Sequence, residues 1–129
     1  MSSSPTLGLA LLVALAGGAG SVLRALLIHH IGIRRVDPLP AGTMVVNASG
    51  SLVLGILTGL SLYHGLGTHL LAVVGVGLCG GYTTWSTASW ETMHLVRTGH
   101  HREAAVYTVG GLVVCLGAAA AGLGLTALF

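Results

Sequence analysis

Charged residues are scarce in this sequence. Only 6% of the 129 residues are Asp, Glu, Lys or Arg, whereas 53% are hydrophobic. Soluble domains carry about 25% charged residues, and a mean hydropathy of +0.91 is far too high for one. We therefore expect an integral membrane protein. The formal charge of +2, without a basic run that contains aromatic residues, also excludes nucleic acid as a partner.

Acidic residues and cysteines are too few for the usual catalytic or metal sites. The carboxylates are limited to Asp37, Glu91 and Glu103, and no paired acids, nucleophile elbow or phosphate-binding glycine loop occurs. Cys79 and Cys115 lie in separate apolar blocks without a CxxC spacing, which predicts neither a disulfide framework nor a zinc site. The sequence therefore argues against an enzyme.

Apolar blocks divide the chain into four segments long enough to cross a bilayer, which takes about 20 residues each. We expect spans over residues 7–28, 43–63, 70–96 and 104–128, joined into one all-α membrane domain that covers residues 1–129. No Lys or Arg precedes the first block, so we interpret it as a retained span and not as a signal peptide.

Small and polar residues mark the contacts expected between these spans. Ser51, Gly55 and Gly59 recur every four residues on one face of the second span, as in a helix–helix contact. Asn47 lies one turn earlier on that face. It can serve as interhelical glue, or its amide can offer two donors to an anion. Arg24, the one charge of the first span, is interpreted either as snorkelling to the interface or as organising a site.

Arginines and histidines fall mainly in connections. All five arginines lie in, or at the edge of, the first and third connections, which predicts these inside the cell and both termini outside. The seven histidines raise the possibility of metal transport, but they lie in loops and at span ends. An interfacial position without a metal is the better interpretation.

The third span is interrupted near its centre. Gly80 and Gly81, followed by Thr83 and Thr84, are poor helix formers, and we expect Gly80 and Thr83 to bracket a break. Freed backbone groups at bilayer depth need protein, a polar path or an ion. Carbonyl oxygens at the end of the first half suit a hard cation such as Na⁺, so Gly80 and Thr83 are predicted to bind one.

The half-helix after the break is rich in hydroxyls. Thr84, Thr87 or Ala88, and Glu91 share one helical face. A small, strongly hydrated anion needs donors that replace its water, and hydroxyls, an asparagine amide and the edges of aromatic rings supply them.

Three motifs in sequence order resemble those of the Fluc (CrcB) family of fluoride channels, and the resemblance covers nearly the whole chain. They are Gly17-Gly18-x-Gly20-Ser21-x-x-Arg24, Gly42-Thr43-x-x-Val46-Asn47-x-x-Gly50, and Gly77-x-Cys79-Gly80-Gly81-x-Thr83-Thr84-x-Ser86-Thr87 followed by Glu91.

The resemblance implies a dual-topology, antiparallel dimer of four-helix subunits that exports fluoride passively. It also implies a central structural Na⁺, not transported, on the main-chain carbonyls of Gly80 and Thr83. Arg24, Glu91 and Tyr107 match residues with structural or electrostatic roles. The anion path carried over to this chain comprises Asn47, Thr84, Trp85, Thr87, Ala88 and Thr108.

Two departures from the family pattern concern the anion path. Trp85 and Ala88 stand where the family usually has phenylalanines, and Gly111 and Cys115 stand where pore hydroxyls are expected, which leaves Thr108 as the nearest one. The one-sided arginines also suggest a fixed orientation. We therefore hypothesise that the chain is one half of a heterodimer, with a homodimer as the alternative.

Two other functions fit a four-span chain. A small dual-topology transporter of the multidrug type would need a carboxylate within its first span, and residues 7–28 contain none. A membrane assembly subunit that does not conduct ions would have no use for a hydroxyl-rich broken helix.

Overall fold

The structure, a computed structural model, describes residues 6–33 and 39–129. Within these ranges the chain is helical and contains no strand. The described residues contain four helical segments that are long and apolar enough to cross a membrane, and the third of them, Thr68–Arg97, consists of four shorter elements. The predicted all-α fold with four spans is thus confirmed. The elements are α1 (Leu7–Ile33), α2 (Ala41–His64), α3 (Thr68–Leu70), the π-helix η1 (Leu71–Cys79), α4 (Gly80–Tyr82), α5 (Ser86–Arg97) and α6 (His101–Thr126).

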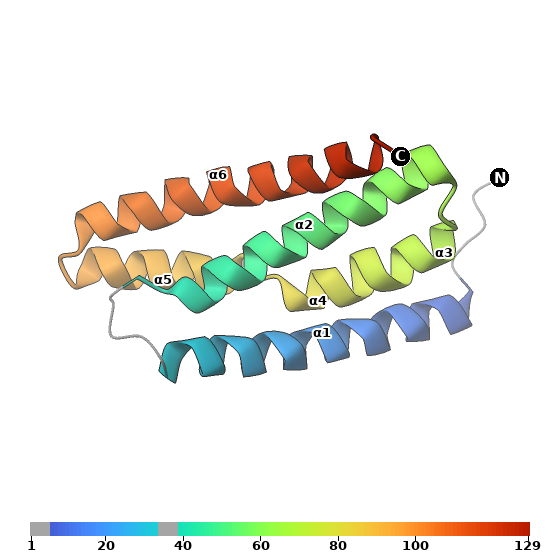
Figure 1. Ribbon diagram of the computed structural model, residues 1–129. Coiled ribbons are helices and arrows are strands. Elements are labelled where there is room, and N and C mark those ends of the chain that lie inside the picture. The colour runs from blue at the N-terminus through green and yellow to red at the C-terminus, as the bar shows by residue number, and fades with distance from the viewer. Residues whose placement is uncertain (1–5, 34–38) are drawn as a thin grey trace.

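The four spans run alongside one another, and the first turn of α1 lies at the same end of the bundle as the last turn of α6 (Figure 1). The turn between α2 and α3 lies at that end, whereas the turn between α5 and α6 lies at the opposite end (Figure 1). Arg97 and Arg102 flank this second turn. Arg34 and Arg35, on which the predicted orientation also depends, lie outside the described residues.

The helix ends differ from the expected spans by a few residues. α1 continues to Ile33, so His29 and His30 are helical and not part of the first connection. α2 begins at Ala41, directly after Pro40, which lacks the N–H that a helix interior needs. α6 begins at His101, which puts Glu103 inside its first turn, where its charge favours the helix dipole.

Glycines allow the backbones of neighbouring spans to touch. A Cβ at Gly55 would meet the carbonyl of Ala119, and one at Gly59 would meet the side chain of Thr126, so two glycines of the predicted stripe on α2 do lie against α6. On the other side of the bundle, α1 approaches the third span in the same way. Gly20 lies against the backbone of Leu78 and Gly81, and Gly81 in turn against the carbonyl of Gly17. Close packing of this kind replaces the hydrophobic effect as the force between helices in lipid.

Substituting Gly20 with alanine is expected to destabilise the bundle, because its Cβ would overlap the Leu78 carbonyl. Overpacking costs about 1–3 kcal/mol. The matched control is Gly18→Ala on the same helix, where a Cβ meets nothing within 4 Å. Melting temperatures in detergent should fall by several degrees for Gly20→Ala and stay level or rise for Gly18→Ala. Equal melting temperatures for the two variants would contradict the described packing.

A buried apolar cluster joins α5 to α6. Leu95, Ala104 and Tyr107 form it, and Met44 and Ala88 pack against it. Most other large apolar side chains of α1 and α6 are exposed, for example Leu15, Val22 and Val113. The bundle therefore presents apolar surface outward, as a protein surrounded by lipid or by another subunit does.

Candidate functional site

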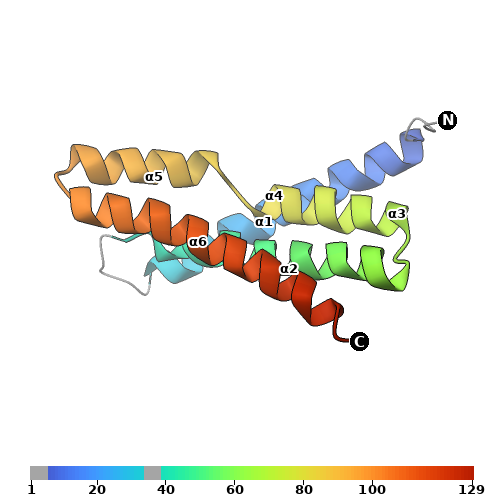
Figure 2. The same cartoon turned by 90° about the horizontal axis from the view of Figure 1, so that it is seen from above.

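The break in the third span begins after Tyr82. Gly80 and Gly81 are helical, as part of α4, whereas Thr83 is extended with φ −81° and ψ 161°. Helix resumes at Ser86, the first residue of α5, and Figure 2 shows the extended segment between α4 and α5. The predicted break is confirmed, but Gly80 does not border it. The intrinsic preference of the two glycines is overridden because Gly81 packs against the backbone of Gly17.

Asn47 forms hydrogen bonds to the backbone of the break with both the nitrogen and the oxygen of its side-chain amide. Its Nδ2 donates to the Thr84 carbonyl, and its Oδ1 accepts from the Thr84 N–H, each at 2.8 Å. In an uninterrupted helix that N–H would bond the Gly80 carbonyl. Asn47 therefore satisfies two groups that the break frees and leaves the Gly80 carbonyl without its helical donor.

Arg24 contacts the break from α1. Its Nη1 donates to the Thr83 carbonyl at 3.0 Å. One turn earlier on the same helix, Ser21 Oγ lies 3.2 Å from the carbonyl of Gly81 and 3.0 Å from that of Gly17. A cation inside a span is costly unless it finds such acceptors. Arg24 thus organises the break and adds a positive charge next to it.

The first turn of α5 is capped by a threonine. Thr84 is buried, and its Oγ1 accepts from the Thr87 N–H at 3.2 Å and donates to the Thr87 hydroxyl at 3.1 Å. Ala88 packs against the cluster around Tyr107. The side chain of Trp85 is exposed over 82% of its surface. Of the predicted anion path, Asn47, Thr84 and Thr87 are thus linked by hydrogen bonds, whereas the Trp85 side chain is on the surface.

Glu91 accepts a hydrogen bond at each carboxylate oxygen. Tyr107 donates to Oε2 at 2.6 Å, and Thr43 donates to Oε1 at 2.9 Å. Both donors are buried, with 4% and 1% of their surfaces exposed. Three spans therefore meet at one carboxylate, which accepts a hydrogen bond at both of its oxygens.

Thr108 lies on the outer side of the same contact between α5 and α6. Its hydroxyl is 3.1 Å from that of Thr92, and this pair is exposed. The pair Thr92–Thr108 is adjacent in sequence to the pair Glu91–Tyr107. Hence one pair faces the interior of the bundle and the other faces outward.

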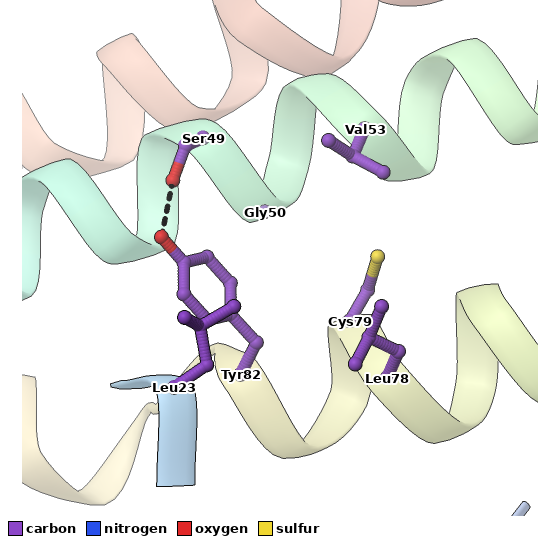
Figure 3. A pocket seen from close by; sticks show the side chains of 7 residues that line it. All are labelled: Leu23, Ser49, Gly50, Val53, Leu78, Cys79 and Tyr82. Carbon is purple, nitrogen blue, oxygen red and sulfur yellow. Dashed lines mark hydrogen bonds between the residues drawn. The ribbon is translucent and has the colours of Figure 1, made fainter. Parts of the chain in front are cut away.

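A pocket of about 240 Å³ opens beside the break, between α1, α2 and the third span (Figure 3). Its polar feature is a bond of 2.9 Å between the hydroxyls of Tyr82 and Ser49. Ser49 already donates to the Val45 carbonyl, so Tyr82 is the donor. The remaining lining, which includes Val53 and Cys79, is apolar and carries no charge. This pocket is therefore not suited to an ion.

Four contact residues had no assigned role before the structure was known: Ser21, Thr43, Ser49 and Thr92. Two of them carried a signal. Ser21 and Thr43 belong to the family motifs, and Thr43 also precedes Asn47 by four residues and so shares its face of α2. The others depend on contacts with distant parts of the chain. Among the described residues, no three His, Cys, Asp or Glu side chains gather closely enough to hold a metal.

Replacing Arg24 with methionine is expected to lower the stability by about 1.5–3 kcal/mol, the range for a hydrogen bond to a charged group. The Thr83 carbonyl would lose its donor within a span. Arg24→Lys should retain part of the stability, because an ammonium still donates but lacks the planar fork. Melting temperatures in detergent test this order. A methionine variant that melts like the wild type would show that the contact contributes nothing.

Comparison with known proteins gives a family match over most of the chain. Residues 11–123 match the family model described as "CrcB-like protein, Camphor Resistance (CrcB)". A protein of Leifsonia xyli subsp. xyli named "Fluoride-specific ion channel FluC 1" is 44% identical over 113 residues, which are 88% of this chain and 82% of that protein.

Two further relatives are similar over comparable lengths. "Fluoride-specific ion channel FluC 2" of Cutibacterium acnes is 43% identical over 88% of this chain and 93% of its own length. "Fluoride-specific ion channel FluC" of Nitrobacter winogradskyi is 40% identical over 88% of this chain and 90% of its own length. Since the match extends over nearly the whole length on both sides and includes all four spans, this chain belongs to the CrcB (FluC) family.

Proposed function

We propose that the chain is a subunit of a fluoride-selective channel, which lets fluoride leave the cell passively across the plasma membrane and so lowers its cytoplasmic concentration. The observation that carries this proposal is the extended segment within the third span, which Asn47 and Arg24 hold between two half-helices. The names of the relatives point to the same ion. The family is one of ion channels and not of enzymes, which agrees with this proposal.

The anion path is proposed to follow the start of α5. Positive charge is available there from Arg24 and from the N–H groups at the helix N-terminus, which favour anions. The donors proposed are the amide of Asn47, which keeps one free N–H, and the hydroxyls of Thr84 and Thr87. Further along the path, we include the ring of Trp85, the surface at Ala88 and the hydroxyl of Thr108. Glu91 and Tyr107 hold α5 in place.

A structural Na⁺ on the carbonyls of Gly80 and Thr83 is proposed as well. Neutral carbonyl oxygens are the ligands that a hard cation prefers, and the Gly80 carbonyl lacks its helical donor. Gly80 is also exposed, so oxygens from a second copy have access to the same ion. The Thr83 carbonyl already accepts from Arg24, but it has a second lone pair. When bound, the cation would supply positive charge that stabilises the freed carbonyls.

The subunit is proposed to work as an antiparallel, dual-topology dimer in lipid, either with itself or with a different subunit. Two observations support this: Gly80, whose carbonyl lacks its helical donor, is exposed, and the polar pair Thr92–Thr108 faces outward from α5 and α6. The heterodimer remains our preferred hypothesis because of Trp85, Ala88 and the one-sided arginines. Both termini are proposed to lie outside the cell.

Fluoride efflux from proteoliposomes, followed with a fluoride electrode, tests the function. The purified chain should release fluoride but not chloride, either alone or with a partner subunit, and assembly without Na⁺ should reduce the release. No fluoride release in either form would refute the channel. Full release by the single subunit would refute the heterodimer. Dependence on a proton gradient would favour the multidrug-type transporter, and a chain that transports nothing would favour an assembly subunit.

A further inference from the structure

We propose that Thr92 and Thr108 together bind the permeating anion on the outer side of the contact between α5 and α6. This inference rests on the proposed function and adds Thr92, a residue without an assigned role, to the anion path. The ligand is a small anion, fluoride, held by two hydroxyl protons.

The hydroxyls of this pair have more acceptors nearby than they have protons. Thr92 Oγ1 lies 2.9 Å from the Ala88 carbonyl, and Thr108 Oγ1 lies 2.9 Å from the Ala104 carbonyl. The two hydroxyls are also 3.1 Å from each other. Each hydroxyl has one proton. Only two protons are available for the three contacts, which are two to carbonyls and one between the hydroxyls. In any fixed arrangement, one of the three contacts is therefore not a hydrogen bond.

Both hydroxyl groups can turn their protons away from the carbonyls at little cost in free energy. Each of the two carbonyls belongs to the residue four positions earlier in the same helical segment, and such a carbonyl accepts a main-chain N–H as well. The bond from a threonine hydroxyl is a second, optional bond for that carbonyl. Turning both hydroxyls toward an anion therefore leaves no carbonyl unsatisfied. A donor pair of this kind needs little reorganisation.

The geometry suits one small anion between the two oxygens. Charge-assisted O–H···O⁻ bonds are about 2.5–2.7 Å long. An anion at a similar distance from both hydroxyls fits beside oxygens that are 3.1 Å apart. Fluoride must exchange its water for donors of this type. The exposed side of the pair leaves room for the anion to arrive and leave.

The neighbouring carboxylate does not compete for these protons. Glu91 precedes Thr92 in the chain, but its oxygens accept from Tyr107 and Thr43. Tyr107 is buried, whereas Thr108 is exposed. The carboxylate therefore faces the interior of the bundle, and the two threonine hydroxyls are available on the outside. The pair also offers hydroxyls near the positions where Gly111 and Cys115 offer none.

The test uses the full chain in proteoliposomes, with its partner subunit if the wild type requires one. Thr92→Val and Thr108→Val remove one donor each, and initial efflux rates are measured over a range of fluoride concentrations. Hydrogen bonds to charged groups contribute enough to change binding about tenfold to about a hundredfold. We expect the half-saturating fluoride concentration to rise by that factor. Thr92→Ser, which keeps the hydroxyl, should behave like the wild type.

Thr58→Val is the matched control. Thr58 also donates to the carbonyl four residues earlier, at 2.8 Å, but it lies on α2 and away from the pair. This variant should keep the wild-type fluoride dependence. Wild-type behaviour of Thr92→Val and Thr108→Val would overturn the inference. So would an equal loss in Thr92→Ser, because the hydroxyl would then not be the active group. If the wild type releases no fluoride at all, the proposed function fails instead.

Discussion

Replacing Asn47 with leucine is expected to abolish fluoride release and to lower the stability by about 2–6 kcal/mol. Leucine has a similar volume but no polar atoms, so the N–H and the carbonyl of Thr84 would both lose their partner at 2.8 Å. Each orphaned buried group costs about 1–3 kcal/mol. Water is scarce at this depth of a membrane and offers little substitute. Efflux and melting temperature should therefore fall together.

The variant Asn47→Asp distinguishes the contribution of the donated hydrogen bond from that of the accepted one. Aspartate keeps the acceptor for the Thr84 N–H, but an ionised carboxylate would face the Thr84 carbonyl, where Asn47 donates. Protonation gives the side chain a donor again. The melting temperature of Asn47→Asp should therefore rise toward that of the wild type at acidic pH, whereas that of Asn47→Leu should not. Parallel pH curves for the two variants would show that the paired amide geometry is not what stabilises the break.

Glu91→Leu is expected to destabilise the bundle by about 3–6 kcal/mol. Tyr107 and Thr43 would both lose a charged acceptor while they remain buried. A hydrogen bond to a charged group contributes about 1.5–3 kcal/mol. Glu91→Gln should cost less, since one oxygen still accepts. The melting temperature in detergent measures both effects.

Glu103→Gln is the control for the loss of a glutamate. Glu103 lies in the first turn of α6, where a negative charge contributes about 0.3–1 kcal/mol through the helix dipole. Its effect should therefore be several times smaller. A double-mutant cycle of Glu91→Gln with Tyr107→Phe should be non-additive, because both changes affect one hydrogen bond. Additive losses, or equal losses at Glu91 and Glu103, would contradict the network.

Apolar composition was sufficient to predict four spans, and the poor helix formers were sufficient to predict that the third is interrupted. The position of the interruption was not predictable to the residue. Gly80 and Gly81 have weak helix propensity, but contact with Gly17 keeps α4 helical. The non-helical backbone is found instead at Thr84, where Asn47 bonds to it. Tertiary contacts thus moved the break toward the β-branched residues that follow the glycines.

The partners of the site residues were less predictable than the residues themselves. Arg24 and Glu91 stood out because charges inside spans are rare. Their partners, Thr83 and Tyr107, are 59 and 16 positions away, and no local pattern identifies such pairs. The exposure of Trp85 was also unforeseen. Lipid and protein both accept apolar side chains, so the sequence of a spanning helix does not reveal which of the two a given side chain contacts.

The outward position of Trp85 has a spectroscopic consequence. The chain contains two tryptophans, and the other one, Trp90, lies on α5 with 67% of its surface exposed. Its ring is stacked on that of His94, with centroids 5.3 Å apart. The intrinsic tryptophan fluorescence of the chain therefore comes entirely from α5 and its immediate vicinity. Emission wavelength and quenching by brominated lipids will report whether that surface lies in hydrocarbon or against another polypeptide, without any added label.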